Sequence, residues 1–150
     1  MSKKEFAKSD NSFRWSDVPL LSYKEHDNTF RNISRQVLFE GTAETPTQLR
    51  YFEIDTDGHS TLEQHDHEHV VYIVRGKGRA LNGDKIVALK TNDVLHIPPS
   101  TWHQFRACEG EPLGFLCMVN LDRDRPHLPT EKDLEELRRS MDIAQFIQTR

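Results

Sequence analysis

The stretch GHSTLEQHDHEHVVYIVRGKG, residues 58–78, decides how this chain is interpreted. One glutamate and three histidines in it occupy every second position: Glu63, His65, His67 and His69. A further histidine, His103, follows the turn-forming segment Pro98-Pro99-Ser100-Thr101. Imidazoles and a carboxylate packed this densely beside strand-like sequence are typical of a metal-binding site.

Strand geometry limits how these side chains can meet. A strand rises about 3.3 Å per residue, so Glu63 to His69 on one straight strand would span about 20 Å. Metal–ligand bonds are only about 2.0–2.2 Å long, so the ligand atoms must converge on one point. The chain must therefore turn between Glu63 and His69, and the polar segment Asp66-His67-Glu68 is suited to that turn.

Two registers of the turn are open. In the first, Glu63 and His65 point inward from one strand and His69 points inward from the start of the next, where both faces are apolar and expected to be buried. In the second, His65 and His67 form the pair, His69 falls in the turn, and the next strand supplies no ligand. The first register gives the more complete site. With His103 added, it predicts four ligands: Glu63, His65, His69 and His103. His67 is then a turn or pocket-rim residue, and its replacement of Glu63 as a ligand stays an alternative.

Size and composition bound the other possibilities. A chain of 150 residues supports one domain with a real core. A net charge of −4 and a pI near 6.0 argue against nucleic acid as partner. The longest apolar run, Val70–Val74, is too short to span a bilayer, so no membrane partner is expected.

The cysteines and the N-terminus bear on the compartment. Two cysteines, Cys108 and Cys117, do not make a disulfide framework. The polar N-terminal segment lacks the apolar stretch of a signal peptide, so a cytoplasmic location is expected. Cys117 lies in the apolar run Phe115–Val119 and is interpreted as plain core.

Short strand-like runs separated by turn residues dominate the middle of the chain. They are Gln36–Glu40, Gln48–Asp55, Ser60–His65, His69–Arg75, Gly78–Leu81, Lys85–Lys90, Asp93–Ile97, His103–Ala107 and Gly114–Asn120. Asn82-Gly83-Asp84 is a strong hairpin signal, and Asp55-Thr56-Asp57-Gly58 indicates another turn. Closely spaced strands with no helices between them predict an antiparallel sandwich or barrel.

The two ends differ from this middle. Residues 1–12 are predicted to be a disordered leader, and Phe13–Asp27 an arm laid over the barrel domain, residues 13–128, or over a neighbouring subunit. Residues 129–150 are predicted to hold one short helix, capped by Thr130 with Asp133 three residues on. An apolar stripe would pack this helix on the barrel or on a dimer partner: Leu134, Leu137, Met141 and Ala144.

From Leu49 to Val119 the sequence resembles the cupin superfamily. Its first motif matches Gly58–Gly76, with the two motif histidines aligned on Glu63 and His65 and the motif glutamate on His69. The second motif matches Asp93–Pro99 and ends at His103. Relative to the family, a glutamate stands for a histidine and a histidine for the carboxylate. The total of three imidazoles and one carboxylate is unchanged.

This resemblance implies an all-β fold, a double-stranded β-helix or jelly-roll barrel, here with a short C-terminal helix. It also implies a divalent transition metal (Fe, Mn, Ni, Zn or Cu) inside the barrel mouth, and a homodimer. The remaining histidines are expected to have minor roles, with His96 in packing and His26, His59 and His127 facing solvent. Arg50, Tyr51 and Tyr72 are equally consistent with pocket-lining and structural roles. Asp122–Arg125 is interpreted as a solvated loop.

The function expected from these features is a metal-dependent enzyme acting on a small polar molecule. Oxygenase chemistry of the dioxygenase type is favoured, and the resemblance also permits a decarboxylase, a lyase or an isomerase. Glu63 is the candidate catalytic base as well as a ligand. The alternative is a non-catalytic barrel that binds or senses a small molecule.

Overall fold

The computed structural model describes residues 3–9, 12–24 and 28–150. In these residues the strands are β1 (Phe6–Ser9), β2 (Ser12–Trp15), β3 (Leu21–Ser22), β4 (Arg31–Phe39), β5 (Thr47–His59), β6 (His69–Asn82), β7 (Lys85–Lys90), β8 (Val94–Ile97), β9 (His103–Ala107) and β10 (Leu113–Asn120). The helices are α1 (Glu131–Leu137) and α2 (Met141–Phe146). The predicted all-β class with a helical C-terminal segment is confirmed.

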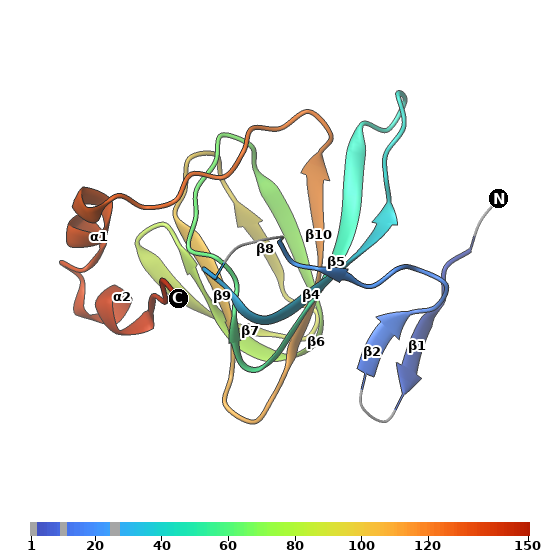
Figure 1. Ribbon diagram of the computed structural model, residues 1–150, viewed down its shortest axis with the longest axis horizontal. Helices are drawn as coiled ribbons and strands as arrows, with labels where there is room; N and C mark the ends of the chain where they lie inside the picture. Colours follow the sequence, from blue (N-terminus) through green and yellow to red (C-terminus); the bar gives the residue numbers. More distant parts are fainter. Residues whose placement is uncertain (1–2, 10–11, 25–27) are drawn as a thin grey trace.

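The strands from β3 to β10 form one antiparallel sheet that closes into a barrel. Its order is β10-β6-β9-β5-β4-β3, with β7 and β8 also paired to β6. Strand β10 pairs with both β5 and β6 and so closes the path. The hairpin β1–β2 lies at one side of this barrel and the two helices lie at the opposite side (Figure 1).

The chain turns and bends where glycines permit it. Asn82 pairs with Lys85 across the predicted hairpin, and Gly83 takes a φ of 69° there. The two runs predicted on either side of Gly76 are one continuous strand, β6, in the structure. Gly76 has a φ of 75°, and a Cβ at this position would lie 1.7 Å from the carbonyl oxygen of Pro112. Only glycine therefore allows β10 to approach β6 this closely.

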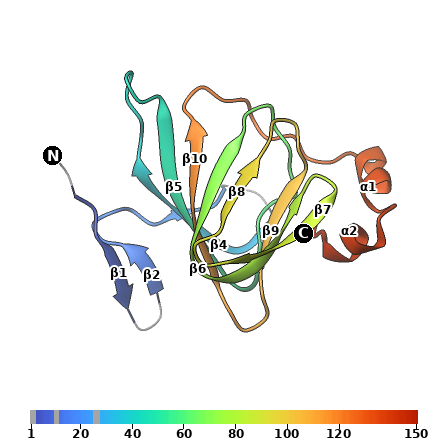
Figure 2. The ribbon, with the colours of Figure 1, turned by 180° about the vertical axis from the view of Figure 1, so that it is seen from behind.

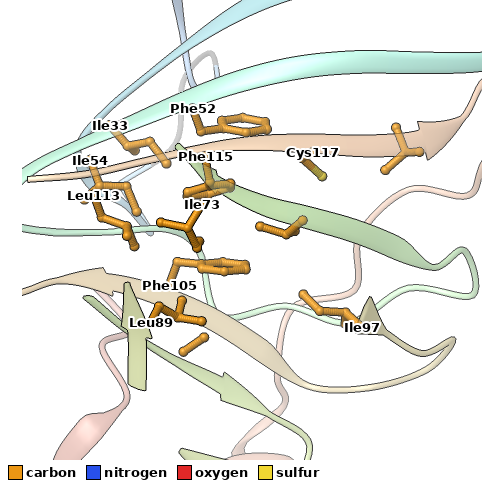
Figure 3. Close-up of a cluster of buried hydrophobic side chains, with 13 residues drawn as sticks. Ile33, Phe52, Ile54, Ile73, Leu89, Ile97, Phe105, Leu113, Phe115 and Cys117 are labelled. Atoms are coloured by element: carbon orange, nitrogen blue, oxygen red, sulfur yellow. The ribbon is translucent and has the colours of Figure 1, made fainter. Parts of the chain in front are cut away.

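Side chains from alternate strand positions fill the barrel. Figure 3 shows the cluster they form around Phe52, Phe105 and Phe115. On β6, the residues His69, Val71 and Ile73 all point inward and are buried. On its other face Val70 and Tyr72 are 37% and 40% exposed, so the prediction that both faces are buried is wrong.

Two segments near the histidines differ from prediction. Ser60–His65 is not a strand, because in this segment only Glu63 and Gln64 make isolated bridges. Asp55–Gly58 is not a turn but part of β5. There the chain bulges, with Asp57 at a φ of 61°, and absorbs the extra residues between the Ile54 and His59 pairings.

The N-terminal segment covers the outside of the barrel. Residues 6–9, which were expected to be disordered, form β1; residues 1–2 and 10–11 of the expected leader lie outside the described residues. Phe6 and Trp15 lie with ring centroids 5.7 and 6.4 Å from that of Tyr51. The side chain of Gln36 on β4 accepts from the Trp15 amide and donates to the carbonyls of Trp15 and Val18. The arm is therefore bound to the barrel of its own chain. This is the first of the two arrangements predicted for it, the other being contact with a neighbouring subunit.

The C-terminal segment forms two helices rather than one. Thr130 and Asp133 form the predicted capping box of α1, but Ser140 caps a second helix, α2. The break rotates the second helix, so Met141 is exposed and Ile143 and Phe146 are buried in its place. These side chains pack with Leu134 against Leu62 and Leu81. Figure 2 shows both helices beside the barrel from the reverse side. Across the described residues, neither helix has the length and apolarity needed to cross a membrane.

Candidate metal centre

A bend at Asp66 and His67 lies between His65 and His69 and positions both side chains. The Asp124 carboxylate accepts hydrogen bonds from the Asp66 amide at 2.8 Å and the His67 amide at 3.1 Å. It also contacts Nδ1 of His67 at 2.8 Å, and these hydrogen bonds hold its pKa well below the usual range. The predicted turn is confirmed. Residues 122–125 do form a loop, as predicted, but Asp124 has a structural role that was not predicted, because its carboxylate fixes this turn.

Three imidazoles converge inside the barrel mouth. His65 precedes the bend, His69 begins β6, and His103 begins β9. One ligand atom from each lies within 4.8 Å of the other two. The Nε2 atoms of His65 and His69 are 2.6 Å apart. All three side chains are buried.

The other ring nitrogen of each histidine faces a hydrogen-bond partner. His65 Nδ1 is 2.8 Å from the His67 carbonyl oxygen, and His103 Nδ1 is 2.8 Å from the Thr101 carbonyl oxygen. His69 Nδ1 is 3.0 Å from the Cys117 sulfur. A proton held on Nδ1 leaves Nε2 as the lone-pair donor, which is the usual state of a metal-binding imidazole. These residues therefore fit a divalent transition metal.

Burial also keeps the three rings neutral. It lowers the pKa of His65 to about 4, with a further contribution from the nearby His103. The pKa values of His69 and His103 are lowered as well, in both cases chiefly by burial. Metal binding requires deprotonated ligands, so this environment prepares the site at neutral pH.

Glu63 lies at the edge of this group. Its backbone pairs with that of His103, and its Oε1 is 4.0 Å from His103 Nε2. Its Oε2 is 2.5 Å from Nζ of Lys24, which belongs to the N-terminal arm. The structure thus brings all four predicted ligands to one cavity, with the carboxylate occupied by an ion pair. Coordination by Glu63 stays a prediction.

The other histidines are placed as follows. His67 stacks on His65 with ring centroids 3.6 Å apart, and it lines the cavity. His96 and His127 are exposed, and His26 lies outside the described residues. The expectation that His59 faces solvent is wrong. Its side chain is buried between the carbonyl oxygens of Ser60 and Arg150, because the C-terminal segment covers the end of β5.

A cavity of about 210 Å³ opens beside the histidines. Arg50 lines it, whereas Tyr51 is covered by the arm and Tyr72 is on the outer face. The lining residues that had no predicted role in the site include Lys24, Arg35, Cys117 and Arg123. Arg50, Phe52 and Ile54 share one face of β5 because they are alternate residues. This alternation was the sequence signal that could have placed Arg50 inside the barrel.

Cys117 differs most from its expected role. It belongs to the buried cluster (Figure 3), but its sulfur faces two N–H groups, His69 Nδ1 at 3.0 Å and Arg50 Nη2 at 3.4 Å. Burial raises the pKa of this thiol, and the charge and hydrogen bond of Arg50 act in the opposite direction. Cys117 is therefore a polar member of the cavity wall as well as core.

A closed antiparallel barrel with a histidine cradle inside its mouth defines a class of small barrels that hold metal ions and small molecules in one interior site. Residues 50–119 match the Cupin domain family. The chain belongs to the cupin family.

Three matches, one to a sequence and two to solved structures, extend this finding over almost the whole chain. One is a 1-methylthio-D-xylulose 5-phosphate methylsulfurylase from Rhodospirillum rubrum, 49% identical over 95% of this chain and 91% of that protein. Another is a cupin 2 conserved barrel domain protein from Rhodopseudomonas palustris, with a TM-score of 0.90 and 46% identity over 99% of this chain and all of the other. A cupin-2 domain structure from Rhodospirillum rubrum has a TM-score of 0.85 and 49% identity, covering 94% of this chain and 95% of that one.

Proposed function

We propose that this protein is a metal-dependent enzyme that transfers the methylthio group of a 1-methylthio-sugar phosphate to a thiol. The observation that carries the proposal is a buried thiol in the same cavity as three convergent imidazoles. The 49% identical methylsulfurylase supplies the substrate class. A cavity of about 210 Å³ suits a small metabolite, because pockets for drug-sized ligands run from about 300 to 1,000 Å³.

His65, His69 and His103 would hold the ion through their Nε2 atoms. A divalent metal in such a site supplies Lewis acidity, which stabilises negative charge on a ketone oxygen. Glu63 is a further candidate ligand. Alternatively, the Lys24–Glu63 pair in the cavity wall delivers a proton to the substrate.

Cys117 has the surroundings of a nucleophile. An imidazole that uses Nε2 as a ligand carries its proton on Nδ1, so His69 donates a hydrogen bond to the sulfur. Arg50 donates a second one. Two N–H donors directed at one sulfur favour the thiolate, which is the reactive form, and they offset part of the burial that raises the pKa of this thiol.

The proposed transfer balances in two steps. The Cys117 sulfur attacks the methylthio sulfur, an S–S bond forms, and the bond from that sulfur to C1 breaks. Its electron pair goes to C1, next to the ketone, and a proton completes a C1 methyl group. A small thiol then attacks the mixed disulfide, which releases a methyl disulfide and restores Cys117.

The test is turnover of 1-methylthio-D-xylulose 5-phosphate with a small thiol by metal-loaded protein, followed by NMR detection of the new C1 methyl group. Cys117→Ser should abolish turnover and keep the bound metal, whereas His65→Ala should lose the metal. Mass spectrometry of the intact protein, before thiol is added, should show a methylthio adduct that is absent from Cys117→Ser. Cys108→Ser is the matched control, because Cys108 does not line this cavity. Full turnover by Cys117→Ser would refute the proposed transfer.

The oxygenase chemistry expected from the ligand types stays a prediction. Oxygen uptake by the same metal-loaded protein that requires His65 and not Cys117 would favour it. The sensing alternative predicts ligand-induced thermal stabilisation that persists in full after chelation.

The homodimer also stays a prediction, and the outer face of the sheet offers a surface for it. Four exposed apolar side chains lie on neighbouring strands there: Val70, Tyr72, Val94 and Met118. Contiguous apolar surface of this kind marks association sites. Light scattering of Tyr72→Glu should show a monomer if this face joins two copies.

A further inference from the structure

The cavity wall also carries an excess of positive charge, from strands β4 and β5 and from the segment after β10. Arg35, Arg50 and Arg123 all line the cavity and are half-buried. The two carboxylates in the lining are engaged elsewhere, Glu63 with Lys24 and Asp124 with the bend at Asp66 and His67. Among the described residues, none of the three guanidiniums has a carboxylate within ion-pair distance.

Strand register places two of these arginines on the inner face. Arg35 pairs with Phe52, and Arg50 pairs with Val37 on one side and with Cys117 on the other. Directly opposed residues of an antiparallel pair share a face, so all of these side chains point into the barrel. Arg35 and Arg50 are diagonal neighbours, a relation that separates Cα atoms by about 7–8 Å.

The guanidiniums have hydrogen-bonding capacity to spare. The Nε atoms of Arg35 and Arg50 are buried and have no hydrogen-bond partner within the described residues. Arg123 donates to the Asn120 carbonyl and to the Gln48 side chain, which hold it in place at the cavity. Buried polar groups are normally hydrogen-bonded, so the two unpaired Nε atoms indicate a missing acceptor.

The charges also act on one another. The pKa values of Arg35 and Arg123 are lowered, first by burial and then by the charge of Arg50; Glu40, outside the cavity, offsets part of this. Like charges assembled without an ion-paired carboxylate cost free energy in the unliganded protein. An anion bound among the three guanidiniums would reduce their mutual repulsion and accept hydrogen bonds from the unpaired Nε–H groups.

We propose that Arg35, Arg50 and Arg123 form a phosphate-binding subsite that anchors one end of the substrate, with the thiol and the metal centre at the other end. The inference rests on the proposed function only for the identity of the molecule that carries the phosphate. Cys117 lies between the two parts of the cavity, since it contacts both Arg50 and His69. A phosphate held by the arginines would thus leave the remote end of a short sugar at the sulfur.

The experiment is calorimetric titration of the metal-loaded protein with inorganic phosphate, D-xylulose 5-phosphate and D-xylulose. Wild-type protein should bind inorganic phosphate and D-xylulose 5-phosphate. It should bind D-xylulose, which has no phosphate, much more weakly. Arg35→Gln and Arg50→Gln should each weaken binding of D-xylulose 5-phosphate by about 10- to 100-fold, the range for a lost charged hydrogen bond. Arg35→Lys should recover part of the affinity, which a loss of fold would not allow.

Arg31→Gln is the matched control. Arg31 is exposed on the same strand as Arg35, and it lines a separate cavity with Arg79, Arg106 and Arg150. Its substitution removes the same charge and should leave phosphate binding unchanged. A loss of binding in Arg31→Gln, with Arg35→Gln unaffected, would move the anion to that other cavity and overturn the proposal. Equal binding of succinate and phosphate would overturn the assignment to phosphate.

The two proposals fail separately. Wild-type phosphate binding by Arg35→Gln and Arg50→Gln would refute the subsite and leave the Cys117-dependent transfer untouched. Conversely, arginine-dependent phosphate binding in a protein that forms no methylthio adduct would refute the transfer and keep the subsite.

Discussion

The buried histidines should make the metal-free protein sensitive to mild acid. His65, His69 and His103 are held neutral in the folded state, with the pKa of His65 lowered from 6.5 to about 4. In the unfolded chain each would titrate near 6.5. Unfolding below that pH therefore takes up protons, and the free energy of unfolding falls as the pH falls.

The size of this effect follows from the pKa shift. Between pH 7 and pH 5 an unfolded histidine of pKa 6.5 gains about 2 kcal/mol from protonation, while a folded one of pKa 4 gains almost nothing. Three such residues give an upper value of about 6 kcal/mol, and water entering the barrel mouth would reduce it. The whole stability of a domain is about 5–15 kcal/mol, so the metal-free protein should be close to unfolding at pH 5.

Urea unfolding of chelator-treated protein at both pH values, followed by tryptophan fluorescence, measures the difference directly. His65→Gln should reduce the pH-dependent loss by about 2 kcal/mol, because it removes one of the three proton-binding groups. Comparing each variant with itself at two pH values cancels its effect on overall stability. A loss below about 1 kcal/mol in wild type, or an equal loss in His65→Gln, would show that the rings are not held neutral.

Three further outcomes are expected from single substitutions. Gly76→Ala should lower the free energy of unfolding in urea by about 1–3 kcal/mol or more, because alanine is strained at a positive φ and its Cβ would clash with Pro112. Gly110→Ala is the control. Gly110 has a similar φ with open space around it, so its substitution should add the backbone strain alone. Asp124→Ala should weaken metal binding about 10- to 100-fold in a chelator competition assay, because the bend that positions His65 loses its hydrogen bonds. Leu134→Ala should cost about 2–5 kcal/mol of stability, and a smaller loss would mean that α1 contributes little to the fold.

The histidine cluster of the candidate metal centre could be predicted because the local sequence carries it. Ligand bonds are short, so the spacing of Glu63, His65 and His69 required a turn near Asp66, and the structure has one there. Residue types completed the inference, because three imidazoles near strand ends are uncommon without a role. The carboxylate that fixes the turn could not be found this way, since Asp124 lies 58 residues beyond Asp66 and resembles any other charge in a loop.

The helical segment shows a different limit. Periodicity predicted one helix and a stripe that included Met141, because Leu134, Leu137 and Met141 are spaced for a single helix. The competing signal was Ser140, a good N-cap, which starts a new helix and rotates the stripe onto Ile143 and Phe146. The N-cap at Ser140 therefore determined the structure here, rather than the helical periodicity from Leu134 to Met141.

The cavity wall proposed to bind substrate could not be predicted from the sequence, for a topological reason. Cys117 reads as core because its neighbours in the chain are apolar, and Arg35, Arg50 and Arg123 read as surface because arginine usually is. Their common face appears only when β4, β5 and β10 pair in register, since opposed residues then point to the same side. The sequence of a strand shows which residues share a face, but it does not show which face points into the barrel. The histidine cluster is thus encoded mainly within short segments, whereas the groups proposed to bind and cleave the substrate are brought together by long-range strand pairing, which a single sequence does not reveal.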